Sequence, residues 1–183
     1  MIQVEFTALE GVLLVTPQVH ADSRGFTVET SSDRELRANG ITDRFVQDNH
    51  SRSGPGTLRG LHFQAPPGQA KLVRVARGAI QDVVVDIRRR SPTFGQHVTF
   101  TLDDTHHRQL YVPAGFAHGF CVVGDGADIL YRLSRYYDPS LEHGIAWDDP
   151  ALAIGWAIRG PILSERDRHH PSLGDLSPEL TDW

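Results

Sequence analysis

Alternation of apolar and polar residues with a period of two is the feature that most constrains how this sequence can fold. The pattern runs through residues 82–88, 97–102 and 129–134. Successive side chains of a strand point to opposite faces, so each segment is predicted to be a strand with one face toward a core. Turn signals rich in glycine, proline or aspartate recur between such segments, at 54–56, 66–68, 91–92, 103–104, 113–115 and 124–126. Many short strands at this spacing predict an all-β fold, either an antiparallel sandwich or a barrel.

Helical signals are few. Ser32 and Glu35 have the spacing of a capping box, and Gly40 is a natural stop, which together predict one helix. A second short helical piece is expected to begin near Ser164. The polar tail after Pro171 is expected to be loosely ordered, apart from the final Trp183.

No internal repeat, low-complexity run or linker divides the sequence. Its 183 residues suit one domain with a sizeable core, so residues 1–183 are predicted to form a single domain. The net charge of −5 gives no basic footprint for nucleic acid. No apolar run approaches the roughly 20 residues of a membrane helix, and the N-terminus does not read as a signal peptide. The one cysteine, Cys121, is read as a buried small hydrophobe, and a cytoplasmic setting is expected.

His62 is the first candidate for chemistry, in the run from Arg59 to Gln64. A lone histidine is more often structural, satisfied in the core or exposed on a loop. On a regular strand, Arg59 and Leu61 would share one face, while His62 and Gln64 share the other. If His62 and Gln64 lie on the inward face, polar side chains occupy positions in the core. Such groups are costly unless paired and are often functional.

The second candidate cluster runs from Pro113 to Phe120 and delivers His118 onto a strand. Pro-x-Gly-x-x-His resembles the second motif of the cupin superfamily, a class of β-barrels with an axial pocket. The first cupin motif holds His-x-His and a nearby glutamate, whereas this chain has His62-Phe63-Gln64 and no glutamate soon after. Two ligands, His62 and His118, are too few for a firm transition-metal site, so a metal-free barrel is predicted. A metal-dependent cupin remains the alternative.

Three further residues have both a structural and a functional interpretation. Tyr131 shares a strand face with Ile129 and Leu133 and is either a core aromatic or a phenol that exchanges a proton. Asp167 lies in a charge run that is most simply a solvated surface. Asp86, flanked by valine and isoleucine on a strand, is a candidate inward carboxylate that orients an imidazole.

Over most of its length, roughly residues 11–173, the sequence resembles the dTDP-4-dehydrorhamnose 3,5-epimerases. The matching motifs occupy residues 22–26, 45–51, 58–64, 69–73, 82–88, 91–95, 115–120 and 145–150. Several long motifs in the right order make the resemblance specific. Two departures, Arg132 and Asp48, lie outside the expected chemistry.

The resemblance implies a cupin-type antiparallel β-barrel, or jelly roll, with a few short helices. It also implies a homodimer, no cofactor and a nucleotide-sugar substrate in rhamnose-type deoxysugar biosynthesis. The family's base falls on His62, its partner aspartate on Asp167 and its tyrosine acid on Tyr131. The substrate-binding positions fall on Arg24, Glu29, Gln47, Asn49, Arg59, Lys71, His118, Tyr137, Glu142 and Arg166.

Epimerisation beside a ketone at C4 removes a proton from C3 or C5, passes through an enolate, and returns a proton on the other face. An imidazole titrating near ~6.5 suits the base, and a carboxylate behind it would hold its tautomer. Lys71 is the candidate donor for the developing oxyanion. The candidate diphosphate ligands are Arg24, Arg59 and Arg166. The candidate thymine contacts are Phe26, Gln47 and Asn49, although Phe26 is equally suited to packing.

Two other functions stay open beside a 3,5-epimerase. The nearer is a single-position epimerase, acting at C3 or C5 alone, from an antibiotic deoxysugar pathway. It would carry the same base and acid. The other is a non-catalytic barrel that only binds a sugar nucleotide, against which the presence of His62, Tyr131 and Asp167 together argues.

Overall fold

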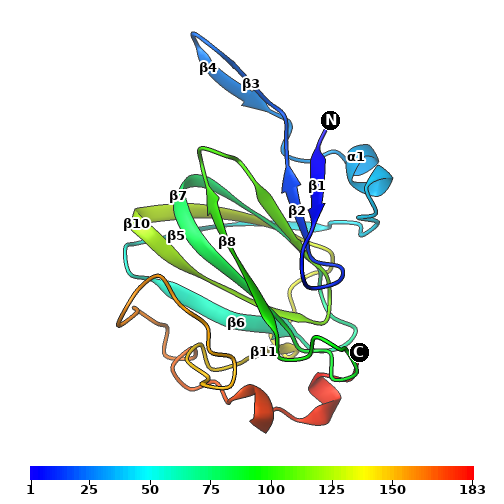
Figure 1. Ribbon diagram of the computed structural model, residues 1–183, viewed down its shortest axis with the longest axis vertical. Helices are drawn as coiled ribbons and strands as arrows, with labels where there is room; N and C mark the ends of the chain where they lie inside the picture. The colour runs from blue at the N-terminus through cyan, green and yellow to red at the C-terminus, as the bar shows by residue number, and fades with distance from the viewer.

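The computed structural model of the chain describes residues 1–183. Nine strands form one antiparallel sheet that curls into a barrel, and two more form a separate hairpin (Figure 1). The strands of the sheet are β1 (Gln3–Phe6), β2 (Leu13–Thr16), β5 (Gln47–Ser53), β6 (Leu58–Gln64), β7 (Lys71–Asp86), β8 (His97–Asp103), β9 (Gln109–Val112), β10 (Phe116–Leu133) and β11 (Glu142–Gly144). The hairpin consists of β3 (Val19–Asp22) and β4 (Gly25–Val28). The predicted all-β antiparallel barrel is confirmed.

Two long strands, β7 and β10, hold the barrel together because each pairs with different neighbours along its length. The first half of β10 pairs with β6, and its second half pairs with β5, while β7 runs beside both halves. The register between β7 and β10 shifts between Val123 and Ala127. At this bend a Cβ on Gly78 would lie 2.0 Å from the carbonyl oxygen of Gly126, so only glycine fits there.

Burial on β7 differs from the one-sided pattern predicted for residues 82–88. Val84 belongs to a cluster of 15 buried residues, whereas Val83 and Val85 belong to a second cluster of 10. The prediction of a single buried face is therefore wrong for this strand. The second cluster includes Leu173 and Leu176, because the C-terminal segment covers the other face (Figure 1).

The predicted helix is present as α1 (Asp33–Ala38), with Ser32 at its N-cap. Gly40 follows with a φ of +87°, the left-handed conformation expected after a helix end. The Ser32 side chain makes no capping hydrogen bond, so the capping-box prediction is wrong. The helix predicted near Ser164 is also wrong. The chain makes only a turn there, with the Arg168 amide donating to the Ser164 carbonyl at 3.3 Å.

The tail after Pro171 is ordered, contrary to the prediction. It forms two short 3₁₀ helices, η1 (Leu173–Asp175) and η2 (Pro178–Leu180). The Leu173 amide donates to the carboxylate of Asp149 at 2.7 Å, and the Trp183 ring packs against Gly68. Leucines spaced along an otherwise polar segment are enough to anchor it to the core.

Cys121 is buried and unpaired, as predicted, and its thiol donates to the side-chain carbonyl of Gln81. None of the helices has the length and apolar character needed to cross a membrane.

Candidate active site

One pocket brings together most of the residues that the sequence singled out. It has a volume of about 150 Å³ and lies where β5, β6, β7, β10 and β11 converge. Its lining includes eight of the predicted residues: Asn49, Arg59, His62, Lys71, His118, Tyr131, Tyr137 and Glu142. Gln69 and Phe120 also line it and were not predicted.

Strand β6 turns His62 into this pocket, while its neighbours Leu61 and Phe63 are buried in the second core cluster. Arg59 was expected on the face of Leu61, yet it lines the pocket together with His62. The strand is irregular at Gly60, which has a φ of +125° and no room for a Cβ beside Gly119. That irregularity breaks the alternation and brings Arg59 to the pocket side.

His62 forms a dyad with Asp167. The Nε2 atom of His62 lies 2.6 Å from an Asp167 carboxylate oxygen, although the residues are 105 positions apart. Burial alone would raise the pKa of Asp167, but the two histidines beside it, His170 and His62, hold that pKa well below its usual range. Desolvation lowers the pKa of His62, and the attraction of Asp167 offsets only part of that effect. At neutral pH the pair is therefore a neutral imidazole backed by a carboxylate, which is the state a general base needs.

Lys71 places a cationic side chain beside the dyad. Its Nζ lies 3.5 Å from the backbone oxygen of His62. Desolvation lowers the pKa of Lys71 to about 8, although the charges of Glu142 and Asp82 act in the other direction. A partly desolvated ammonium is a strong electrostatic partner for an oxyanion, because little water competes for it.

His118 lies next to His62, since the two residues are direct cross-strand partners on β10 and β6. Its Nε2 lies 2.9 Å from both carboxylate oxygens of Asp82, and both side chains are buried. Asp82 was not predicted. Asp86 was predicted to orient an imidazole, but it accepts hydrogen bonds from Arg88, Ser91 and Thr93 instead. The prediction for Asp86 is therefore wrong, and Asp82 fills that role for His118.

A hydrogen-bonded network continues from the pocket to its rim. Glu142 accepts hydrogen bonds from the Tyr137 hydroxyl at 2.5 Å and from Arg166 at 2.6 Å. The Gln47 side chain accepts from the backbone amide of Tyr137 and donates to Asn49. Gln47 and Arg166 are thereby connected to the pocket without lining it themselves.

Three predicted substrate-binding residues lie elsewhere. Arg24, Phe26 and Glu29 are exposed, on or just after the β3–β4 hairpin, which projects away from the sheet (Figure 1). The Arg24 guanidinium pairs with Asp22 at 2.6 Å. The Phe26 ring is 58% exposed and packs against His107. The chain does not bring these three residues to its own pocket.

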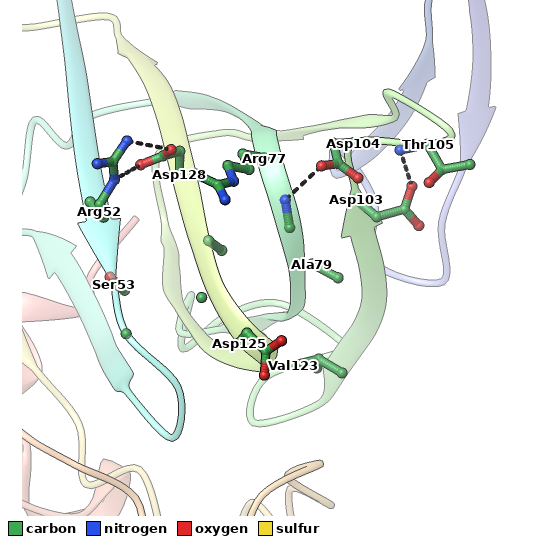
Figure 2. A pocket seen from close by; sticks show the side chains of 14 residues that line it. Arg52, Ser53, Arg77, Ala79, Asp103, Asp104, Thr105, Val123, Asp125 and Asp128 are labelled. Atoms are coloured by element: carbon green, nitrogen blue, oxygen red, sulfur yellow. Dashed lines mark hydrogen bonds and ion pairs between the residues drawn. The ribbon is translucent and has the colours of Figure 1, made fainter.

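A larger cavity of about 720 Å³ lies at the bend of the barrel, where β5, β7, β8 and β10 approach one another (Figure 2). Arg52 and Asp128 form an ion pair at 2.7 Å on its wall, and Asp104 accepts from the Gly78 amide. None of the predicted site residues lines this cavity. Size alone is thus a poor guide to the chemistry in this molecule.

One residue beside the dyad, His170, was not predicted from the sequence. His170 packs against His62, with the two rings nearly perpendicular and their centroids 5.6 Å apart. Its Nε2 lies 3.4 Å from the same Asp167 oxygen that His62 contacts. These three side chains are also the group whose ligand atoms lie close enough together to hold a metal ion. In sequence His170 is one of two adjacent histidines in a charged turn, and nothing there separates it from His169.

The chain matches known proteins over nearly its full length. The family model described as dTDP-4-dehydrorhamnose 3,5-epimerase matches residues 6–175. A relative of that name from Neisseria gonorrhoeae is 50% identical over 163 residues, which are 88% of this chain and 49% of that relative, so the chain spans about half the relative's length.

Two solved structures are similar throughout the fold. A dTDP-6-deoxy-D-glucose-3,5-epimerase from Legionella pneumophila, in complex with dTDP-4-keto-L-rhamnose, has a TM-score of 0.95 and 42% identity, and the match covers 100% of this chain and 98% of that one. A 3'-monoepimerase from Streptomyces bikiniensis, in complex with dTDP-quinovose, has a TM-score of 0.87 and 37% identity, covering 92% and 86%. From the family match and these identities, the chain belongs to the dTDP-4-dehydrorhamnose 3,5-epimerase family.

Proposed function

We propose that the chain is a 3,5-epimerase of a dTDP-linked 4-keto-6-deoxyhexose, acting by acid–base chemistry through enolate intermediates. The observation that carries the proposal is the His62–Asp167 dyad, opening into a pocket that Lys71 and Tyr131 also line. A proton beside a ketone is acidic enough for an imidazole to remove, so the reaction requires a base, an acid and a stabilised oxyanion. The pocket offers one side chain for each task.

His62 is the proposed base. Its Nε2 faces the Asp167 carboxylate, which leaves Nδ1 to take the proton from carbon. The carboxylate fixes this tautomer and stabilises the imidazolium that forms. Tyr131 is the proposed acid that returns a proton on the other face of the sugar. Lys71, aided by His118, is the proposed partner of the enolate oxygen, a contact worth roughly 3–4 kcal/mol in a preorganised site.

The proposed diphosphate ligands are Arg59 and Arg166, whose planar guanidinium groups match phosphate oxygens. Arg59 lines the pocket, and Arg166 is held at the rim by Glu142. The proposed contacts to the rest of the nucleotide sugar include Gln47, Asn49 and Tyr137, which share a hydrogen-bonded network.

A homodimer is part of the proposal, because the β3–β4 hairpin exposes Phe26 and Val19 and holds Arg24 and Glu29 away from the chain's own pocket. In a dimer, such a hairpin offers its arginine and aromatic ring to the substrate in the partner's pocket. We also propose that the enzyme acts in the cytoplasm and that residues 1–183 form a single catalytic domain. The buried, unpaired Cys121 is compatible with a reducing compartment.

The alternative is epimerisation at C3 or C5 alone. The similarity to the Streptomyces bikiniensis 3'-monoepimerase supports this alternative. The Neisseria gonorrhoeae relative, at 50% identity, and the Legionella pneumophila 3,5-epimerase, with 42% identity and a TM-score of 0.95, are both more similar to this chain than that monoepimerase, which favours action at both carbons. Incubation with the 4-keto sugar nucleotide in deuterium oxide, followed by NMR, distinguishes the two. Deuterium at both C3 and C5 is expected. Deuterium at one carbon only would establish the single-position epimerase. No deuterium at either carbon would indicate a barrel that binds the sugar nucleotide without catalysis.

A further inference from the structure

His170 follows a surface turn, yet its side chain is largely buried beside the catalytic dyad of His62 and Asp167. Its side chain is 10% exposed, and its Nε2 points to the Asp167 oxygen that already contacts His62. The distances from that oxygen are 2.6 Å to His62 and 3.4 Å to His170. Two imidazole nitrogens therefore converge on one carboxylate.

A glycine leaves the space that the ring of His170 occupies. A Cβ on Gly144 would lie 2.3–2.5 Å from three atoms of the His170 ring, so the ring rests directly on the backbone of β11. Gly144 is also the cross-strand partner of His62, which explains why the two histidines meet. In this position the His170 Nε2 is buried, and its 3.4 Å contact with Asp167 does not have the geometry of a hydrogen bond. A buried polar nitrogen without a hydrogen bond is costly, and a ligand that it binds would remove that cost.

We propose that His62, Asp167 and His170 form a binding site for a zinc ion, and that zinc bound there inhibits the enzyme. The three donor atoms lie within 4.8 Å of one another. Two imidazoles and one carboxylate are a donor set that zinc accepts, at roughly 2.0–2.2 Å from each atom. Tetrahedral donors at that range lie about 3.3 Å apart. The pair Asp167–His170, at 3.4 Å, already has this spacing, while the pair Asp167–His62 must open slightly from 2.6 Å.

A second cleft, of about 550 Å³, gives the ion a way in beside the sugar pocket. It is lined by His62 and Asp167, and also by Arg59 and Arg166, the proposed diphosphate ligands. His62 thus lies between this cleft and the pocket that contains Lys71. The cleft also gives water access to a fourth coordination position, since three protein ligands leave one open.

Inhibition follows from the tautomer of His62, and this part rests on the proposed function. In the active state the proton on Nε2 is donated to Asp167, and the lone pair on Nδ1 accepts the proton from carbon. Zinc takes the lone pair of Nε2, so the proton of the neutral ring moves to Nδ1. A ring with a proton on Nδ1 and a metal on Nε2 has no lone pair left for the substrate.

Zinc binding is tested without substrate, by calorimetric titration of zinc chloride and by the visible spectrum of the cobalt(II)-substituted protein. The unmodified chain should bind one ion, and His170→Asn should weaken binding at least tenfold. His169→Asn is the matched control, because this neighbour is exposed and bonds to the Glu165 backbone, and it should bind zinc as the unmodified chain does. Gly144→Ala, which pushes the His170 ring aside, should weaken binding as well.

Absence of binding to the unmodified chain at micromolar zinc would overturn the site, as would equal affinity in His170→Asn. Inhibition is measured separately, as the fraction of each variant's own rate that remains with zinc. Binding with the predicted variant pattern but without inhibition would retain the metal site and refute the role of His62 as base. If neither zinc binding nor zinc inhibition is found, only the metal site is refuted. The rate measured without zinc still tests the proposed epimerase activity separately.

Discussion

Replacing Asp167 with asparagine should slow the enzyme by removing the charge behind the base. The substitution keeps the size of the side chain, which is 4% exposed, and it keeps an oxygen able to face His62. What it removes is a charge-assisted hydrogen bond of 2.6 Å. Such a bond contributes about 1.5–3 kcal/mol, and each ~1.4 kcal/mol is a tenfold change in rate. The predicted fall in kcat/KM is therefore about 10- to 100-fold.

The loss is larger if the asparagine turns its amide nitrogen toward His62, since the ring must then carry its proton on Nδ1. The pKa of His62 should also fall further, because Asp167 raises it. The acid limb of the pH profile of kcat/KM should accordingly move to lower pH. The assay is the initial rate of deuterium incorporation, followed by NMR, with Glu165→Gln as control because that side chain is 84% exposed. A value of kcat/KM within threefold of the unmodified enzyme, with an unmoved acid limb, would refute the dyad.

Three other substitutions test the proposed acid, the oxyanion partner and the packing of the C-terminal segment. Tyr131→Phe should still exchange the substrate proton with deuterium but return it on the same face; NMR that finds inversion at the normal rate would reject Tyr131 as the acid. Because the pKa of Lys71 is about 8, the ammonium loses its charge as pH rises through that value. The kcat/KM should fall on this alkaline side, and Lys71→Gln should have low activity without that limb; an identical pH profile would count against the role of Lys71. Leu173→Ala should destabilise the fold by about 2–5 kcal/mol in a denaturant melt, since Leu173 is 6% exposed, whereas Ile162→Ala, at a position 63% exposed, should cost far less. Equal effects would show that the C-terminal segment does not pack as described.

The sequence predicted the strands well because alternation is a local property. It predicted burial less well, since burial depends on what covers a strand. Val83 and Val85 face the C-terminal segment, whose polar composition concealed Leu173 and Leu176. Hydrophobic pattern alone does not reveal that two distant segments cover each other.

The site residues also differ in how far the local sequence predicts them. His62 stood out because its polar neighbours occupy strand positions that favour apolar residues. Asp167 emerged only through resemblance to a family, since a contact across 105 residues leaves no local trace. Asp82 and His170 were missed for the same reason, as each acquires its partner through tertiary contacts.

Solvent exchange by His62→Ala tests directly whether His62 removes the proton from carbon. The unmodified enzyme and the variant are incubated with the 4-keto sugar nucleotide in deuterium oxide, and deuterium at C3 and C5 is followed by NMR. Circular dichroism and a thermal melt establish that the variant keeps its fold. If His62 is the base, exchange at both carbons is abolished in a folded protein. Exchange at the unmodified rate at either carbon would show that another group removes that proton.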